Sequence, residues 1–471
     1  MNKKVIVIGI DGGSWNYIQS WIDNGKLPIF KKLQAQGAWG VLKSQLPPVT
    51  SPNWKCFSTG LNPAKLGVFW WENVDVVNRK IYIPNARSFS GKEVFDYLSD
   101  AGFRVGVINM PTIYPPHKIN GLMVAGGPDA MESGFTYPEA LEKMLKSKFG
   151  WRGLPKNISF MKQNADEVIE EIYYLIEARF KAAEFLLTEG KFDFFMVVTY
   201  LINVLQHYHW GDDKVYKAWR IIDDGVGRLI EKFPDYTFLF MSDHGTSEIK
   251  VKFNIATWLE QKGYLKLKSQ SASSKLRSLG ITREKVTKVL TRLGLKEFIK
   301  RIVPAAIQQK LPDEQGSVQR LGKAELIDWD NSRCVPSGQG PIYLLDKNPE
   351  FTGRLISELE ALEYNGIKIV DKVYRKAEIY SGPYFDQAPD LIVDQGKYTH
   401  FSGSLGFKQP FEAPQAWKGE NEPEGLFLAY GCGIKPQHLD TSILNLTPTI
   451  LKMFDVPVPE EMDGEVIILK I

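Results

Sequence analysis

Acidic residues and a histidine follow two short apolar segments of the chain. Asp11 comes directly after Val5–Ile10, and Asp243 and His244 follow Tyr236–Met241. Carboxylate and imidazole groups at the ends of strands are common ligands of a divalent metal ion. The two segments therefore indicate a metal site, although an aspartate before two glycines is also common in an ordinary turn.

Hydroxyl and amide side chains gather where a helix is expected to begin. Thr50, Ser51 and Asn53 follow two prolines, which bar a helix before Thr50, and Pro52 suits a first helical turn. A helix N-terminus attracts anions through its free N–H groups and its dipole. A hydroxyl at this position could attack a phosphorus centre if a bound metal lowered its pKa. The alternative is a capped helix without a chemical role.

A histidine near the middle of the chain shares a predicted helix face with an asparagine. His207 lies four residues after Asn203, a spacing that places two side chains on one side of a helix. His207 could bind a metal ion, but a lone histidine on an aromatic-rich face is more often a core residue. His400 is a further unassigned histidine, in a segment rich in glycine and serine.

Short apolar segments that alternate with longer amphipathic segments must position these side chains. Such alternation predicts an α/β fold with a largely parallel sheet, whose central strands are apolar because both faces are buried. The expected strands are Val5–Ile10, Val105–Asn109, Phe192–Val198 and Tyr236–Met241, and the expected helices are Leu27–Gln36, Val94–Ala101, Glu167–Leu187 and Lys214–Phe233. Ligands of such sheets bind beyond the carboxyl ends of the strands, which is where Asp11, Asp243 and His244 are expected.

The composition is that of a globular protein and excludes several functional classes. Of the 471 residues, 44% are hydrophobic and 24% are charged, which excludes disorder as the main state. The formal net charge of +3 is too small for a protein that binds nucleic acid over its whole surface. Three widely spaced cysteines argue against a disulfide framework. No apolar run is long enough to span a bilayer or to act as a signal peptide, so we expect a cytoplasmic protein.

One segment differs in composition from the rest of the chain. Residues 266–310 carry twelve Lys and Arg residues but only two Glu, with apolar residues at helical spacing between them. We expect a basic helical insertion at 266–325, which divides an α/β core formed by 1–265 and 326–471. The insertion could be a solvated appendage, a lid over an anionic substrate, or a peripheral membrane contact, because basic amphipathic helices adsorb to anionic lipids.

Motifs spread over most of the chain support a more specific hypothesis. They include Val7-Ile8-Gly9-Ile10-Asp11-Gly12, Pro47-Pro48-Val49-Thr50, Thr59-Gly60-Leu61-Asn62-Pro63, Ser242-Asp243-His244-Gly245 and Thr447-Pro448-Thr449-Ile450-Leu451. In this order they resemble the alkaline phosphatase superfamily, and within it the type I phosphodiesterase/nucleotide pyrophosphatase branch. The resemblance implies an alkaline-phosphatase-like, mostly parallel central sheet flanked by helices. It also implies a metal-dependent phosphoric ester hydrolase, either a phosphodiesterase or a phosphomonoesterase.

The same resemblance assigns roles to the residues of a first metal site. It implies that Asp11, Thr50, Asp243 and His244 hold one divalent ion, which is Zn, Mn or Mg. Thr50 is then also the nucleophile, and the reaction passes through a phospho-threonine intermediate. Asn53 matches the asparagine that follows the nucleophile in the family, where it binds a phosphoryl oxygen.

A second metal site of the family is altered in this chain. The family uses an aspartate, a histidine four residues later and a C-terminal histidine. The chain keeps His207 but has Asn203 and Asn421 at the other two positions. An amide oxygen is a much weaker ligand than a carboxylate or an imidazole. We therefore expect one ion rather than two, with His209 or His400 as alternative ligands for a second.

This departure leaves the reaction open. The protein could hydrolyse its phospho-threonine slowly, pass the phosphoryl group to an acceptor other than water, or bind a phosphorylated ligand without turnover. A sulfatase is disfavoured, because Thr50 and Trp54 stand where that chemistry needs a convertible Cys or Ser and an Arg. The expected partner is a phosphorylated small molecule or a lipid-linked phosphate, and not a specific nucleic acid.

Overall fold

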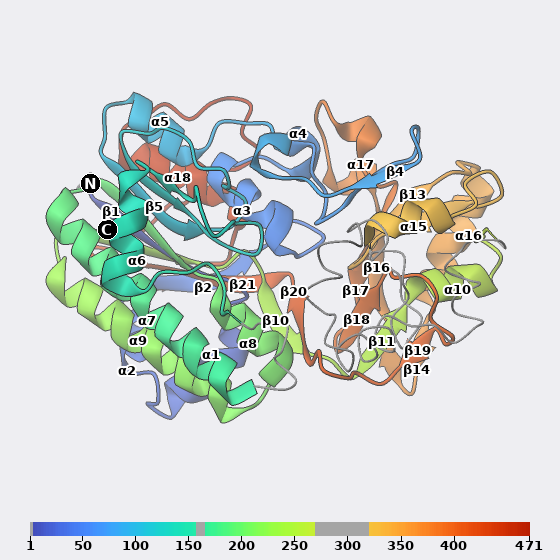
Figure 1. Cartoon of the computed structure of the whole chain (residues 1–471), viewed down its shortest axis with the longest axis horizontal. Coiled ribbons are helices and arrows are strands. Elements are labelled where there is room, and N and C mark those ends of the chain that lie inside the picture. The colour runs from blue at the N-terminus through green and yellow to red at the C-terminus, as the bar shows by residue number, and fades with distance from the viewer. Residues whose placement is uncertain (1–2, 157–164, 269–319) are drawn as a thin grey trace, which may run out of the picture.

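Two lobes make up the molecule in the computed structural model, which describes residues 3–156, 165–268 and 320–471. The larger lobe contains the central sheet and both ends of the described chain, and the smaller lobe lies beside it (Figure 1). The two strands β10 (Gly245–Glu248) and β20 (Gly419–Glu422) pair with each other and lie between the lobes.

The larger lobe is built on one mixed sheet. Its strand order is β22-β2-β21-β9-β1-β8-β5-β6-β7, with β23 beside β2. The strands are β1 (Val5–Ile10), β2 (Ala38–Lys43), β5 (Val105–Met110), β6 (Gly121–Ala125), β7 (Thr136–Tyr137), β8 (Phe194–Thr199), β9 (Thr237–Met241), β21 (Glu424–Tyr430), β22 (Gln437–His438) and β23 (Thr441–Ser442). The five central strands from β9 to β6 are parallel, whereas β21 and β7 run antiparallel to their neighbours.

Parallel pairing brings the carboxyl ends of three strands to one edge of this sheet. Ile10, the last residue of β1, lies beside Thr199 of β8, and Gly9 lies beside Met241 of β9. All residues of β1, β8 and β9 are buried, because helices cover both faces of the sheet. The polar residues that follow β1, β8 and β9 in sequence therefore leave the sheet at one place.

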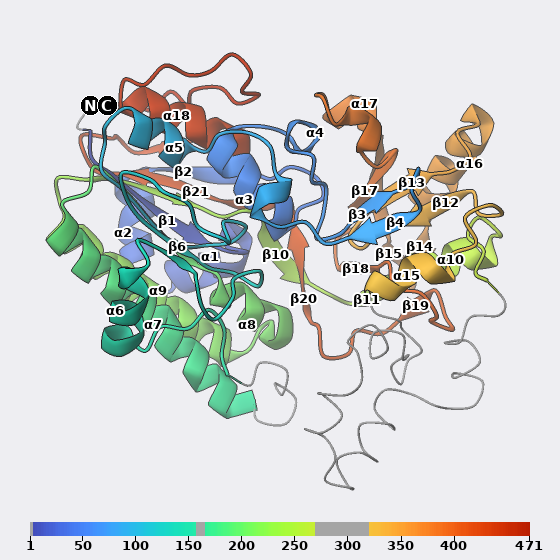
Figure 2. The same cartoon turned by 45° about the horizontal axis from the view of Figure 1, so that its top comes forward.

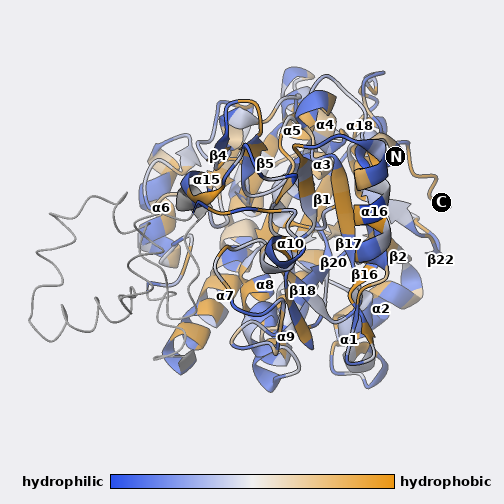
Figure 3. Cartoon of the chain, turned by 90° about the vertical axis from the view of Figure 1, so that its right-hand side faces the viewer, coloured by the Kyte–Doolittle hydropathy of each residue, from blue (hydrophilic) through white to orange (hydrophobic). Residues whose placement is uncertain are grey.

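Helices cover the two faces of the sheet in separate layers (Figures 1 and 2). One layer contains α1 (Trp15–Asp23), α2 (Pro28–Gln36), α6 (Ala140–Phe149), α7 (Ala165–Gly190), α8 (Leu201–His209) and α9 (Asp213–Lys232), and the other contains α3 (Thr50–Thr59), α5 (Val94–Asp100) and α18 (Leu446–Met453). In Figure 3, β1 is hydrophobic in colour and α7 carries both colours, as expected for a buried strand and an amphipathic helix.

The smaller lobe has a hydrophobic core of its own. It contains a four-stranded sheet of β12 (Cys334–Pro336), β13 (Pro341–Leu344), β17 (Leu391–Gln395) and β16 (Val370–Arg375), a three-stranded sheet of β18 (Thr399–Ser402), β11 (Val251–Asn254) and β19 (Phe411–Glu412), and the helices α10 (Ile255–Gln261), α15 (Arg320–Leu326) and α16 (Pro349–Glu360). A buried cluster around Phe253, Tyr343 and Leu355 holds these elements together. The residues expected to form one α/β core thus contain two separate hydrophobic cores.

The predicted α/β architecture is confirmed, and the predicted elements differ from the observed ones only at their ends. Strand β8 begins at Phe194 and not at Phe192, because the backbone of Asp193 bonds to Arg104 in a loop before the strand pairs. Helix α7 extends over Ala165–Gly190, beyond both predicted ends. The local sequence pattern predicts where a helix or strand lies, but it predicts the first and last residues poorly.

The expected basic insertion lies mostly outside the described residues, which end at 268 and resume at 320. The described flanks meet, because Leu267 and Ile327 form an isolated bridge and the N–H of Lys268 donates to the carbonyl of Leu326. The insertion and the division into 1–265, 266–325 and 326–471 stay predictions.

None of the helices in the described ranges combines the length and the apolar character that crossing a bilayer requires.

The contact between helices α2 and α9 can be tested by substitution. The buried carboxylate of Asp223 on α9 accepts hydrogen bonds from the backbone N–H groups of Ile29 (3.2 Å) and Phe30 (2.9 Å) in the first turn of α2. We expect Asp223→Ala to lower the free energy of unfolding by about 2 kcal/mol, because it leaves these N–H groups unpaired. The matched control is Asp224→Ala, whose exposed pair with Arg220 should contribute less than about 1 kcal/mol. Equal denaturation midpoints for the two variants would contradict the assignment.

Candidate active site

The start of α3 presents Thr50 at the edge of the sheet. Thr50 and Ser51 precede the regular part of the helix, because Ser51 has extended dihedral angles (φ −107°, ψ 113°) and Pro52 begins the first full turn. The glycine after the helix, Gly60, has a positive φ of 69° and ends it. The expected helix start at this proline is therefore present, and Thr50 stands just ahead of it.

The amide of Asn53 fixes the loop that leads to Thr50. Its Nδ2 donates to the carbonyls of Gln45, Pro47 and Val49 at 3.0–3.1 Å, and its Oδ1 accepts from the N–H of Gln45 at 2.8 Å. These bonds tie the loop to the helix and so hold Thr50 in place. The phosphoryl contact expected of Asn53 stays a prediction, and it requires that one of these hydrogen bonds be exchanged.

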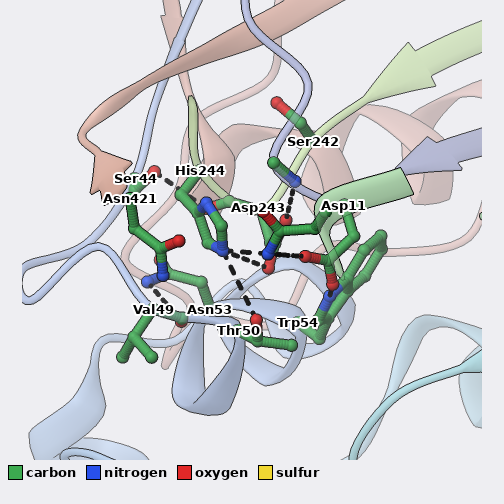
Figure 4. Close-up of polar contacts among 12 residues, drawn as sticks. Asp11, Ser44, Val49, Thr50, Asn53, Trp54, Ser242, Asp243, His244 and Asn421 are labelled. Atoms are coloured by element: carbon green, nitrogen blue, oxygen red, sulfur yellow. Dashed lines mark hydrogen bonds and ion pairs between the residues drawn. The ribbon is translucent and has the colours of Figure 1, made fainter. Parts of the chain in front are cut away.

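Four predicted residues converge beyond the carboxyl ends of β1 and β9 (Figure 4). One ligand atom from each of Asp11, Asp243 and His244 lies within 4.8 Å of the others, and all three side chains are fully buried. Thr50 Oγ1 lies 3.3 Å from His244 Nε2. In the described part of the chain, these three residues are the one group of His, Cys, Asp and Glu that meets this distance criterion.

The imidazole of His244 directs its lone pair into this group. Its Nδ1 lies 2.8 Å from the carbonyl oxygen of Gly245, which can only accept, so Nδ1 carries the proton. His244 Nε2 is then an acceptor, and it lies 3.2 Å from Asp243 Oδ2 and 3.7 Å from Asp11 Oδ1. Asp243 Oδ2 has no hydrogen-bond partner. Because Nε2 can only accept, the hydroxyl of Thr50 is its donor at 3.3 Å, and His244 places no N–H between its Nε2 and the two carboxylates.

Burial works against charge on each of these groups. It raises the pKa of Asp243 to about 7, and burial together with the nearby Asp243 raises the pKa of Asp11 well above its usual value. Burial also lowers the pKa of His244, so the imidazole stays neutral. A divalent cation would offset this cost, because it attracts both carboxylates and the imidazole lone pair. Two oxygen donors and one nitrogen donor suit Zn or Mn.

Three further groups orient the two carboxylates. Trp54 Nε1 donates to Asp11 Oδ2 at 3.0 Å, and Asn203 Nδ2 donates to Asp11 Oδ1 at 2.8 Å. The N–H of Gly12 donates to Asp243 Oδ1 at 3.2 Å. Sequence reasoning missed this role of Trp54, because its partner Asp11 lies 43 residues away in the chain.

Gly9 makes room for this tryptophan. A Cβ atom at Gly9 would lie 2.7 Å from the ring of Trp54 and 2.9 Å from Val198, closer than side chains approach. This glycine, the last residue but one of β1, therefore lets the indole lie against the strand that leads to Asp11.

The residues expected at a second metal site lie next to the first. Asn203 uses its N–H on Asp11, and its Oδ1 has no hydrogen-bond partner. Asn421 on β20 lies opposite Thr246, and its Oδ1 is also unpaired. The structure thus ties one amide to the first site and leaves two neutral oxygens without a donor.

A backbone carbonyl and an aromatic ring, both from a distant part of the chain, contact the side chain of His207. Its Nδ1 donates to the carbonyl of Gly419 at 2.7 Å, and its ring stacks on Trp417 with 3.9 Å between centroids. Burial lowers the pKa of His207 to about 4, which keeps it neutral. His207 therefore has the tautomer of a metal ligand and the surroundings of a core histidine, which were the two interpretations of its sequence position.

The two alternative histidines have other partners. His400 Nδ1 contacts the carboxylate of Glu420, which also accepts from Gln339 Nε2 at 2.7 Å. Burial opposes charge on Glu420, but His400, His207 and the N–H of Asn421 together lower the pKa of the carboxyl. His209 lies 3.8 Å from Asp212. Sequence reasoning did not single out Glu420, because its partner is 20 residues away and joins it only across the fold.

Comparison with solved structures identifies the class of fold. The chain is similar to phosphonoacetate hydrolase from Sinorhizobium meliloti 1021, solved in complex with phosphonoformate, with a TM-score of 0.58 and 14% sequence identity. The match covers 96% of this chain and 95% of the other. A likeness at this identity shows an alkaline-phosphatase-like fold.

The sequence itself identifies the family. The model of the type I phosphodiesterase / nucleotide pyrophosphatase family matches residues 5–337, and the chain belongs to this family. It is therefore a phosphoric ester hydrolase of the alkaline phosphatase superfamily, a metal-dependent class, as the motifs predicted. A search among curated proteins found no match.

Trp54 provides a test of the site that leaves every ligand in place. We expect Trp54→Phe to weaken divalent-metal binding about 10- to 100-fold, because it removes the N–H that orients Asp11 but keeps an aromatic ring. Competition with a chromogenic chelator measures the affinity. The control is Trp258→Phe in the smaller lobe, which should leave the affinity unchanged. If both variants bind metal as tightly as the parent, Trp54 does not support a metal ligand.

Proposed function

We propose that the protein cleaves phosphoric esters through a phospho-Thr50 intermediate, with Asp11, Asp243 and His244 holding one divalent ion. The supporting observation is that Thr50 Oγ1 approaches a buried group of acceptors that need a cation. The burial of two carboxylates beside an imidazole lone pair is unfavourable unless a cation binds between them.

Each residue of the group has a defined part in this proposal. A divalent ion bound here neutralises phosphoryl charge and lowers the pKa of a neighbouring hydroxyl. Thr50 Oγ1 releases its proton to solvent and attacks the phosphorus, a new O–P bond forms, and the bond to the leaving group breaks, so that the leaving oxygen departs as an anion and takes a proton from water. Water then attacks the same phosphorus, and the O–P bond to Thr50 breaks to restore the hydroxyl. Asn53 holds the loop before Thr50, so that the attacking oxygen keeps its position.

We infer one ion per chain. Asn203 and Asn421 offer neutral amide oxygens at the second site, and the N–H of Asn203 is already bonded to Asp11. Zn, Mn and Mg remain the candidates. The two unpaired amide oxygens are the observation that favours a second candidate function, which is transfer of the phosphoryl group to an acceptor other than water. A second ion would help to activate that water.

The substrate that we propose is a phosphorylated small molecule. The family name refers to phosphodiesters and nucleotide pyrophosphates, and the structural neighbour is named for a small phosphonate. A lipid-linked phosphate, and a membrane contact through residues 266–310, are hypotheses that depend largely on residues outside the described ranges.

Substitution of Thr50 tests the nucleophile. We expect Thr50→Ala to lower kcat at least about 1,000-fold, because no other group can form the covalent intermediate, whereas Thr50→Ser retains a hydroxyl and measurable turnover. Turnover of p-nitrophenyl phosphate and bis(p-nitrophenyl) phosphate is measured with Mg, Mn and Zn. Ser51→Ala is the matched control for a neighbouring hydroxyl.

Three outcomes would separate the alternatives. Full activity in Thr50→Ala would refute the covalent mechanism. Faster product release from the parent with added small alcohols, together with a phosphorylated alcohol, would identify phosphoryl transfer. Absence of turnover with every ion, alongside binding of phosphate, would identify a ligand-binding protein.

Restoring the family's ligands tests the ion count. In Asn203→Asp/Asn421→His we expect two bound metal equivalents per chain, against one in the parent, by elemental analysis. Without metal the double variant should unfold at a lower temperature than the parent, because a carboxylate replaces an N–H donor 2.8 Å from Asp11 Oδ1. Added Zn or Mn should reverse this loss. Two equivalents already present in the parent would show that the amides suffice as ligands.

A further inference from the structure

A cavity of about 280 Å³ lies beside α3, apart from the group that surrounds Thr50. Its walls come from Lys55 on α3, from residues 86–91, from the start of α5, and from residues 113–117 after β5. None of Asp11, Thr50, Asp243 and His244 lines it. The cavity is therefore separate from the proposed catalytic group.

A buried ion pair forms one wall of this cavity. Lys55 Nζ lies 2.8 Å from Glu93 Oε1, and the two side chains are only 5% and 7% exposed. Glu93 Oε1 also accepts from Ser58 Oγ at 2.7 Å. The ammonium group has three N–H donors, and Glu93 is its one ion-pair partner among the described residues. Lys55 therefore keeps hydrogen-bond donors beyond those that Glu93 satisfies.

The carboxylates that line the cavity already have hydrogen-bond partners, whereas one cation of the lining has no ion-pair partner among the described residues. Asp96 accepts from His117 Nε2 at 2.6 Å and from the N–H of Glu93 at 3.1 Å. The hydrogen bond with Asp96 raises the pKa of His117, which favours its charged form. Arg87 lines the cavity, is exposed, and forms no ion pair with the described residues. The lining carries Lys55 and Arg87 against Glu93 and Asp96, and Arg87 is the one of these two cations that forms no ion pair with a described residue.

Apart from Ser90, the remaining side chains of the cavity are apolar. Phe89, Ile113, Pro115 and Pro116 line it, and the ammonium of Lys55 lies 5.5 Å from the centre of the Phe89 ring. A volume of this size accepts a single small group rather than a drug-sized molecule. A ligand that fits must then combine one negative charge centre with a compact apolar part.

We propose that this cavity binds a small organic anion, a phosphate ester, phosphonate or carboxylate, between the guanidinium of Arg87 and the ammonium of Lys55. The apolar part of the ligand packs on Phe89 and the two prolines. A planar guanidinium binds such anions through two parallel hydrogen bonds. This binding does not require the proposed phospho-Thr50 chemistry.

The position of Lys55 connects the cavity to α3. Lys55 lies in the first regular turns of α3, and it follows Thr50 by five residues. Its ion pair with Glu93 is one of the contacts that hold α3 against α5. An anion in the cavity therefore contacts a side chain of the same helix that presents Thr50, without reaching the reacting atoms.

Direct binding measurements test the proposal. Phenylphosphonate and benzoate, which represent the two kinds of anion, are titrated into the parent protein by calorimetry, with a divalent ion and again with EDTA. Binding that persists in EDTA is independent of the metal group. We expect Arg87→Glu to raise the Kd of this component at least about tenfold, because it replaces a charge-assisted contact by repulsion.

Two controls keep the result interpretable. Arg354→Glu makes the same charge change at an exposed position of α16, and it should leave the Kd within about twofold. Thermal unfolding of both variants verifies that the fold is retained. The proposal is overturned if neither probe binds in EDTA at millimolar concentration, or if Arg87→Glu binds both as tightly as the parent. If Thr50→Ala were fully active, the covalent mechanism would fail, but this binding result would stand.

Discussion

Two buried carboxylates and an imidazole lone pair face one another at the edge of the central sheet. The arrangement of the proposed active site depends on how this unfavourable electrostatic contact is offset. Asp11 and Asp243 lie in surroundings that disfavour their charge, and His244 has its proton on the far nitrogen. Hydrogen bonds from Trp54, Asn203 and Gly12 satisfy only part of the two carboxylates, and Asp243 Oδ2 has no hydrogen-bond partner. A cation is the simplest way to hold these groups together. The proposed chemistry at Thr50 follows from that requirement.

The surrounding fold keeps this group rigid. Parallel strands β1 and β9 deliver Asp11 and Asp243 to one edge, and Trp54 and Asn203 fix the two oxygens of Asp11. Asn53 fastens the loop before α3, which sets the position of the nucleophilic hydroxyl. Preorganisation of this kind reduces the rearrangement needed when a phosphoryl group binds, because the polar groups already point toward it.

The side-chain amide of Asn203 affects the proposed active site through its hydrogen bond and its lack of charge. The motif resemblance predicts an aspartate ligand of a second ion at this position, whereas here the amide donates to Asp11. Under the proposed function, the amide therefore removes a negative charge from the second site and adds a hydrogen bond to the first. Next to it, Glu420 on β20, which lies between the lobes, pairs with the half-buried His400 on β18 of the smaller lobe. The two lobes therefore meet beside the site through polar contacts.

The sequence alone determined the α/β fold, the strands that carry Asp11 and Asp243, the start of α3 and the family, because apolar runs, prolines and motif spacing are local signals. It also showed amides, Asn203 and Asn421, at two positions where the resemblance predicts ligands of a second metal ion. Only the tertiary structure decided the role of Trp54, the bond from Asn203 to Asp11, the pair of His400 with Glu420, and the separate core of the smaller lobe. These features depend on contacts between residues distant in the chain, such as Asn203 and Asp11, whose sequence separation is 192. A local sequence pattern does not indicate which partner a buried polar group will meet.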